Sequence, residues 1–201
     1  MNPQALARST SETRSRRRVR TRLLGLATAL PPHRTLQERI HAFMERVLRH
    51  TAPHKHQRAA LRILQRVNAM SGIEARYCSV PDFNCDDPNE FQFFPANWSL
   101  APFPTTKRRM EVFRDVSVPM IESAARAALQ QAQLAPHDVT HLILSTCTGF
   151  AQPGPDLELM KRLGMRPNVQ RQQMGFMGCY ATVNSLRAAD YIVRSEPDSV
   201  V

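Results

Sequence analysis

Short apolar runs alternate with helical periodicities along this chain. Residues 23–30 form an apolar run that ends at a double proline, which predicts a buried strand followed by a turn. Thr35 and Glu38 then form a T-x-x-E capping box, in which each side chain satisfies a free backbone N–H group of a helix's first turn. The apolar residues that follow recur at helical spacing on one face: Ile40, Phe43, Met44, Val47 and Leu48.

Two more helices are expected before the last third of the chain. Pro53 separates the first helix from a second amphipathic helix over about 55–70. Prolines then recur through residues 78–105, which predicts a long irregular segment of the kind that is usually functional or interfacial. A third helix is expected over about 107–134, with Pro119 in its first turn or at a kink.

Strands and helices alternate again in the last third. Residues 139–146 are typical of a buried strand, and residues 169–174 predict another. Between them, Asp156 is expected to cap a short helix that stops at Gly164, and a further helix is expected over about 181–193. This alternation predicts an α/β layered fold.

Composition agrees with a globular chain that carries a basic tail. The 201 residues are 42% hydrophobic and 22% charged, with a net charge of +10. Seven arginines and a single acidic residue fall within residues 1–22, so we expect a disordered basic tail there and one folded domain over 23–201. A polyanion-binding arm and an organelle transit peptide remain alternatives for the tail. No apolar stretch is long enough to span a membrane and no secretory signal is evident, so we expect a cytoplasmic protein without a membrane partner.

Cys179 is the candidate nucleophile. Gly175 and Gly178 allow a tight strand-to-helix turn, and a thiolate at a helix N-terminus is stabilised by the helix dipole. The alternative is a buried apolar cysteine. The four cysteines are expected to be reduced thiols, because they are too few for a disulfide scaffold.

Other site chemistries find little support. His50, His54 and His56 flank a proline break, and Cys78 and Cys85 lack zinc-ligand spacing, so no metal site is expected. The chain has no phosphate-binding G-x-x-x-x-G-K sequence. Nucleic-acid binding is not expected, because the basic tail is not interleaved with aromatic residues.

Several segments together resemble the bacterial type III polyketide synthases, which are chalcone and stilbene synthase-like enzymes. The nucleophile segment G-F-M-G-C-Y-A (175–181) and the strand and loop T-H-L-I-L-S-T-C-T-G-F (140–150) carry the resemblance. Upstream segments at 25–32, 71–77 and 94–98 match in order. The resemblance implies a thiolase-like layered fold of αβαβα type, of which this chain is the N-terminal half, ending after the nucleophile helix.

The resemblance also implies a chemistry. Cys179 would accept an acyl group from a coenzyme A thioester, and decarboxylated malonyl-CoA would extend it, with no further cofactor. Cys147, Thr148 and Phe150 would line the substrate pocket. The loop 150–155 would reach toward the second subunit of a homodimer.

This sequence departs from the family pattern in two places. Among the expected coenzyme A phosphate contacts only Arg66 matches, because Ile63 and Met70 occupy the lysine positions, with Arg62 or Lys55 as substitutes. The family's catalytic His and Asn follow the nucleophile at a distance, whereas the last histidine here is His141. We therefore expect the 201-residue chain alone to form no polyketide. A non-catalytic remnant, one half of a split enzyme and a ketoacyl synthase III-like enzyme are the alternatives.

Overall fold

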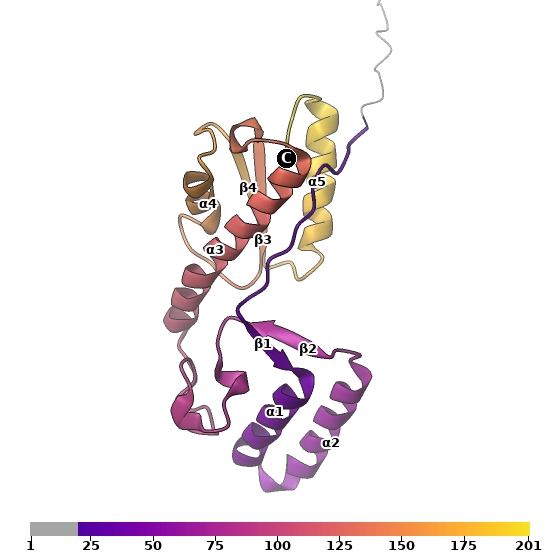
Figure 1. Ribbon diagram of the computed structural model, residues 1–201. Helices are drawn as coiled ribbons and strands as arrows, with labels where there is room; N and C mark the ends of the chain where they lie inside the picture. Colours follow the sequence, from indigo (N-terminus) through magenta and orange to yellow (C-terminus); the bar gives the residue numbers. More distant parts are fainter. Residues whose placement is uncertain (1–19) are drawn as a thin grey trace, which may run out of the picture.

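The computed structural model describes residues 20–201, whose elements fall into two groups (Figure 1). The first group holds β1 (His33–Leu36), α1 (Gln37–Thr51), α2 (His54–Met70) and β2 (Ala75–Cys78). The second group holds α3 (Thr106–Ala132), β3 (His141–Thr146), α4 (Pro155–Leu163), β4 (Gln170–Gly175) and α5 (Ala181–Ser195). Three single-turn 3-10 helices complete the fold: η1 (Asp82–Asn84), η2 (Pro88–Glu90) and η3 (Pro136–Asp138).

The first group is organised around the buried ring of Phe43. β1 pairs antiparallel with β2, and α1 packs against α2. On the other side of α1, Phe43 and Val47 meet Leu100 from the irregular segment that follows β2. Four aromatic rings surround Phe43 with centroids 4.9 to 6.1 Å away: Phe83, Phe91, Phe94 and Trp98. The apolar face predicted from helical spacing therefore forms a core with the proline-rich segment.

A buried carboxylate shapes that proline-rich segment. The Asp82 side chain is fully buried and accepts hydrogen bonds from three successive backbone N–H groups. Gln92 donates to Oδ1 at 3.1 Å, and Phe93 and Phe94 donate to Oδ2 at 3.0 and 2.8 Å. Because a segment this rich in proline forms no strand ladder, the carboxylate supplies acceptors that a neighbouring strand would otherwise provide.

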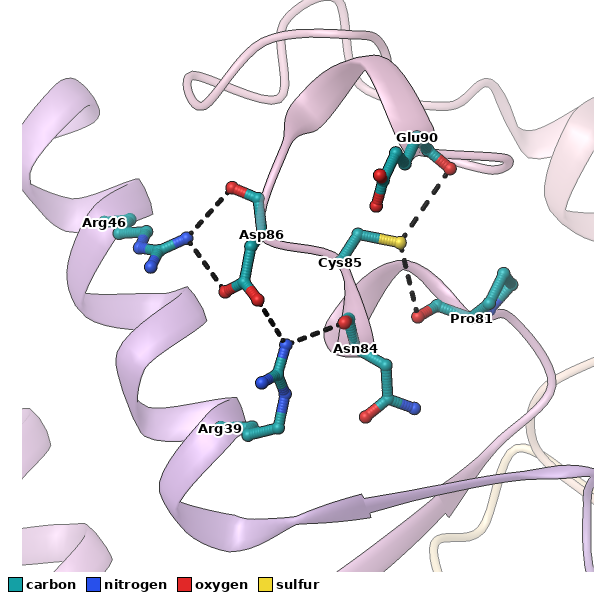
Figure 2. A network of polar contacts seen from close by, with 7 residues as sticks. All are labelled: Arg39, Arg46, Pro81, Asn84, Cys85, Asp86 and Glu90. Atoms are coloured by element: carbon teal, nitrogen blue, oxygen red, sulfur yellow. Dashed lines mark hydrogen bonds and ion pairs between the residues drawn. The ribbon is translucent and has the colours of Figure 1, made fainter.

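Two arginines of α1 hold the same segment from outside (Figure 2). Arg39 donates to the Asp86 carboxylate at 3.0 Å and to the Asn84 carbonyl at 2.7 Å. Arg46 donates to the Asp86 carbonyl at 3.1 Å, and its guanidinium lies 5.0 Å from the centroid of the Trp98 ring. The Arg39 guanidinium lowers the pKa of Asp86, and Arg46 adds to the effect.

Cys85 lies in the same network and is a poor nucleophile. Its thiol is 3.8 Å from the carbonyl oxygens of Pro81 and Glu90 (Figure 2). Burial raises the pKa of Cys85, and the negative charges of Asp82 and Glu90 raise it further. The thiolate form is therefore suppressed at neutral pH.

The second group is a parallel strand pair covered by helices. β3 pairs with β4 in a register that sets Ser145 opposite Met174, and α5 packs on β3. A hydrogen bond between the hydroxyls of Ser145 and Ser185 links β3 to α5. The α/β alternation predicted for residues 139–193 is confirmed, including the end of α4 at Gly164, whose φ is +68°.

The strand predicted over residues 23–30 is wrong. In the described part of the chain this segment joins no sheet, and Leu23, Leu24, Leu26 and Leu30 are 55 to 72% exposed. It runs along α3 and α5 instead, where Thr21 donates to Asp190 at 2.6 Å and the Leu26 N–H donates to Gln131 at 3.0 Å. An apolar run forms a strand only where a neighbouring strand pairs with its backbone N–H and C=O groups. Here the segment is held by side chains of two helices instead.

Two predicted helix caps are also wrong. Thr35 lies in β1 opposite Arg76, so its backbone belongs to the sheet and α1 begins two residues later with Leu36 as N-cap. Asp156 lies inside the first turn of α4, where its buried carboxylate accepts a hydrogen bond from Arg171 at 2.7 Å, and Gly154 is the N-cap. In each case a tertiary partner replaces the local capping interaction.

Pro119 lies in the interior of α3, not in its first turn. The helix begins at Thr106 because the Thr105 hydroxyl accepts the Arg108 N–H at 3.2 Å. Residues 1–19, which hold most of the predicted basic tail, lie outside the described residues, and disorder there stays a prediction. Among residues 20–201, no helix has the length and apolar character needed to cross a membrane.

Replacing the buried carboxylate tests the account of the proline-rich segment. Asp82→Ala should lower the free energy of unfolding by about 2–4 kcal/mol, because buried backbone donors lose their acceptor. Urea unfolding measures the change, with Asp198→Ala at an exposed carboxylate as the control. A loss equal to that of the control would contradict this role of Asp82.

The pKa shift of Asp86 predicts a pH dependence. A folded-state pKa below the unfolded value of 3.8 stabilises the fold above that value, and the contribution is lost as the pH falls through the folded pKa. Wild type should therefore exceed Asp86→Asn in stability at neutral pH, and the two should converge in acid. Unfolding curves over a pH series measure this, and a gap that persists at low pH contradicts it.

Candidate functional site

The parallel pairing of β3 and β4 brings two connecting segments to one end of the sheet. Thr146 and Gly175 are opposite each other at the carboxyl ends of the two strands. Residues 147–154 continue from β3 to α4, and residues 176–180 continue from β4 to α5 (Figure 1). In open α/β sheets, ligands bind beyond the carboxyl ends of the strands, so this end of the sheet is the candidate active site.

Two unusual backbone conformations shape the turn that carries Cys179. Gly178 has a φ of +78° and Phe176 has a φ of +58°. Gly175 also permits a close approach of the strands, since a Cβ atom there would lie 3.0 Å from the Thr146 carbonyl oxygen. Gly175 and Gly178 therefore permit the strand-to-helix turn that the sequence predicted.

Cys179 is exposed directly before the N-cap of α5, which is Tyr180. The alternative of a buried apolar cysteine is therefore excluded. The first turn of α5 holds no acidic residue, so the positive end of the helix dipole is not offset there. This geometry makes the thiol accessible at the positive end of the helix.

His141, the last histidine in the sequence, does not lie beside this thiol. His141 is buried at the beginning of β3, where its Nδ1 atom is 2.9 Å from the Thr140 hydroxyl. Cys179 follows the opposite end of the sheet, and six residues of strand span roughly 20 Å. Within residues 20–201, His141 therefore does not act as the base for Cys179.

The loop after β3 meets the turn that carries Cys179. The Cys147 thiol lies 3.8 Å from the Gly178 carbonyl oxygen, adjacent to Cys179 in the chain. The Thr148 N–H donates to the Thr146 hydroxyl at 3.3 Å, which closes the start of the loop. Phe150 then places its ring 6.2 Å from the ring of Phe176. The structure thus brings the three pocket residues named from the sequence, Cys147, Thr148 and Phe150, to the same end of the sheet.

Phe176 lies at the candidate site through its contact with Phe150, and sequence reasoning did not single it out. It lies three residues before Cys179 in the same turn, which was the available signal. Beyond Phe150, an open cavity of about 770 Å³ lies between α3, α4 and the loop after β3. Among residues 20–201, no three acidic, histidine or cysteine side chains cluster as metal ligands.

Arg66 belongs to a different part of the molecule. It lies on α2, whose packing partner is α1, and it is exposed. Exposed basic residues recur on the same helix, which has no acidic residue: Lys55, Arg58, Arg62 and Arg66. Beside them Ile63 and Met70 are 64% and 73% exposed. None of these four basic side chains forms an ion pair within the described part of the chain.

Comparison with known proteins defines the class to which this fold and site belong. Residues 8–201 match the sequence profile of the N-terminal domain of chalcone and stilbene synthases. The type III polyketide synthase C of Arabidopsis thaliana is 37% identical over 98 residues, which are 49% of this chain and 26% of the relative. The type III polyketide synthase pspB of Penicillium soppii is 28% identical over 171 residues, covering 85% and 38% of the two chains.

A solved structure agrees with these relatives. PKS-I from the brown alga Ectocarpus siliculosus superposes with a TM-score of 0.73 at 32% identity, over 87% of this chain and 44% of that one. The protein therefore belongs to the chalcone and stilbene synthase family, and its fold is the thiolase-like fold of type III polyketide synthases. Matching relatives come from plants, mycobacteria and fungi. The comparisons therefore assign the chain to the family as a whole and not to its bacterial members in particular. The chain spans less than half of the length of these relatives.

Gly178→Ala tests whether the turn positions Cys179. A Cβ atom at Gly178 meets no atom within 4 Å, so only the positive φ opposes the substitution, at a cost of about 1 kcal/mol. We expect the rate of Cys179 alkylation by iodoacetamide to change in this variant. Gly72→Ala is the matched control, because Gly72 has a φ of +63° and an equally open surrounding. Equal alkylation rates in both variants would contradict the positioning role of the turn.

Proposed function

We propose that the chain carries the acyl-accepting half of a type III polyketide synthase, with Cys179 as the nucleophile. The observation that supports this most is the exposed thiol at the start of α5, in the segment of the chain that matches the family. The enzyme would condense an acyl-CoA starter with malonyl-CoA units. No metal or further cofactor is needed for this chemistry.

The reaction places distinct demands on the thiol. The Cys179 sulfur attacks the carbonyl carbon of the acyl thioester, and coenzyme A leaves as a thiol that carries the proton lost by the cysteine. Malonyl-CoA then loses carbon dioxide, and the resulting enolate attacks the acyl group on Cys179, which releases the cysteine thiolate. A thiolate suits both steps because it is a good nucleophile and a good leaving group.

Helix α2 would bind the coenzyme A moiety of the substrate. Its exposed basic residues present charge without competing acidic partners on the same helix, and Arg66 is the proposed phosphate contact. Arg62 and Lys55 are the further candidates. Cys147, Thr148 and Phe150 would border the acyl group at the end of the sheet.

Further polypeptide would complete this site. His141, the last histidine of the sequence, lies at the opposite end of β3 from Cys179. The outer face of α5 exposes apolar side chains, which suits burial under another part of the protein: Tyr180, Val183, Leu186 and Tyr191. We propose that a C-terminal half covers this face and supplies a His and an Asn. The loop over residues 150–155 would meet the second subunit of a homodimer.

A second candidate is a non-catalytic interaction partner. The position of His141 at the far end of β3 favours it, because the last histidine of the sequence then cannot act as the base for Cys179. The two candidates differ in one property. A catalytic domain acquires an acyl group on Cys179, whereas an interaction partner does not.

Incubation with hexanoyl-CoA tests the proposed function. Intact-mass spectrometry should show slow addition of one hexanoyl group, sensitive to hydroxylamine, because the exposed thiol can attack the thioester without a base. Cys179→Ala should abolish the addition, and Cys147→Ala should retain it. Absence of the adduct, or its persistence in Cys179→Ala, would overturn the proposal.

The same chain should form no polyketide when malonyl-CoA is added. Decarboxylation requires oxyanion donors, and the loss of one such donor costs about 10²–10³ in rate. Product analysis by liquid chromatography checks this expectation. A polyketide product from the 201-residue chain alone would show that it is wrong.

A further inference from the structure

Helix α2 exposes a stripe of large apolar side chains. Ile63, Val67 and Met70 are 64%, 62% and 73% exposed, and no residue of this helix is buried. Their spacing of four and three residues places them in line on one face of the helix. Single apolar residues are common on protein surfaces, whereas a contiguous row of them marks an interaction surface.

A row of positive charge lies along one side of this stripe. Lys55, Arg62 and Arg66 follow one another at spacings of seven and four residues, and Arg58 lies four residues before Arg62. The helix contains no acidic residue. No ion pair within residues 20–201 includes any of these four side chains. The surface of α2 therefore joins uncompensated positive charge to exposed apolar area.

This surface offers more than the phosphates of coenzyme A require. A phosphate is bound by charged and hydrogen-bonding groups, and it gains nothing from apolar neighbours. Ile63 and Met70 nevertheless stand at the two positions where the family pattern has lysine. From Lys55 to Met70 the surface extends roughly 22 Å, at about 1.5 Å per residue. A length of this order suits the contact of two helices.

The surface also lies on the Cys179 side of the molecule. Figure 1 shows the first group of elements beyond the end of the sheet at which α5 begins, with α2 at the outer edge of that group. Cys179 directly precedes the N-cap of α5. A donor docked on α2 is therefore placed toward the end of the sheet that carries Cys179, and away from the end that carries His141.

Charge and burial together select the kind of partner. A second copy of this chain would bring like charges together on this face, which opposes association. A helix that lies in a lipid surface buries its whole apolar face, whereas Ala60 and Leu64, on the other side of the stripe, are already half-buried within the protein. An acidic helix with apolar side chains of its own is complementary to both rows.

We propose that α2 docks an acidic carrier protein, which presents the acyl group as a thioester of a phosphopantetheine arm. The inference rests on the proposed function and adds a protein-bound donor to acyl-CoA, which contains the same arm. Arg66 would contact a phosphate in either donor, and the apolar stripe would contact the carrier alone. The Cys179 sulfur attacks the thioester carbonyl carbon, the bond from that carbon to the sulfur of the arm breaks, and the arm leaves as a thiol with the proton lost by Cys179.

The test compares two donors of one acyl group in the 201-residue chain. The first is hexanoyl-CoA, and the second is a strongly acidic acyl carrier protein loaded with hexanoyl-phosphopantetheine. Intact-mass spectrometry follows acylation of Cys179. The kcat/KM with the loaded carrier should exceed that with hexanoyl-CoA about tenfold, because docking adds charge and apolar contacts that coenzyme A lacks.

Two changes on α2 separate the donors. The double variant Ile63→Ser/Val67→Ser removes apolar contact without altering charge, so it should slow transfer from the carrier about tenfold and leave transfer from hexanoyl-CoA unchanged. The unchanged rate with hexanoyl-CoA also shows that the variant is folded. Leu23→Ser/Leu26→Ser, at exposed apolar positions outside α2, is the matched control and should alter neither rate.

The charge of the docking surface is tested at Arg58, which is not among the proposed coenzyme A contacts. Arg58→Glu should slow transfer from the carrier about tenfold, because it places an acidic side chain against an acidic partner. Transfer from hexanoyl-CoA should stay within twofold of wild type. Arg166→Glu, at an exposed arginine outside α2, is the control.

The outcomes distinguish this inference from the proposed function. Equal rates with the two donors, together with variants that slow neither, would overturn the inference and leave the assignment of Cys179 standing. No acylation by either donor would overturn both. The inference is also wrong if the double variant abolishes co-sedimentation with phosphatidylglycerol vesicles but leaves transfer from the carrier unchanged, because α2 would then be a lipid contact.

Discussion

The parallel pairing of β3 with β4 is the constraint on which the candidate site depends. Because the strands run in the same direction, the segments that follow them leave from one end of the sheet. Cys147, Phe150, Phe176 and Cys179 lie in those two segments and would otherwise be separated by the whole of α4. The hydroxyl contact between Ser145 and Ser185 then ties α5 to β3, which fixes the helix that follows Cys179. The chemistry therefore depends on the register of two short strands.

In the first group of elements, side-chain hydrogen bonds hold the irregular segment in place, whereas in the second group backbone hydrogen bonds hold the strands together. Asp82 gathers the N–H groups of the proline-rich segment, and Arg39 and Arg46 fasten the same segment to α1. α2 packs against α1 and lies at the outside of the molecule, where its basic residues are exposed (Figure 1). Cys85 in the first group and Cys179 in the second have different environments. Cys85 is enclosed among carboxylates that suppress its thiolate, whereas Cys179 is open at a helix N-terminus.

Sequence reasoning was most successful where local signals and tertiary structure agree. Helical spacing predicted α1, α2 and α5, and the glycines at 175 and 178 predicted the turn before α5. It failed where a distant partner replaced a local one. Thr35 joined a strand opposite Arg76, Asp156 turned inward to Arg171, and residues 23–30 ran along two helices. The contact of Phe176 with Phe150 could not be predicted either, because it depends on the pairing of β3 and β4.

The central claim is that an acyl group carried by Cys179 lies at the carboxyl end of this sheet. A crystal structure of the chain with a dodecanoyl thioester on Cys179 tests it most directly. The account predicts electron density for the acyl group at the end of the sheet, bordered by Cys147, Thr148 and Phe150. Density that runs instead into the apolar groove of about 750 Å³ between α3, β3 and α5 would contradict it.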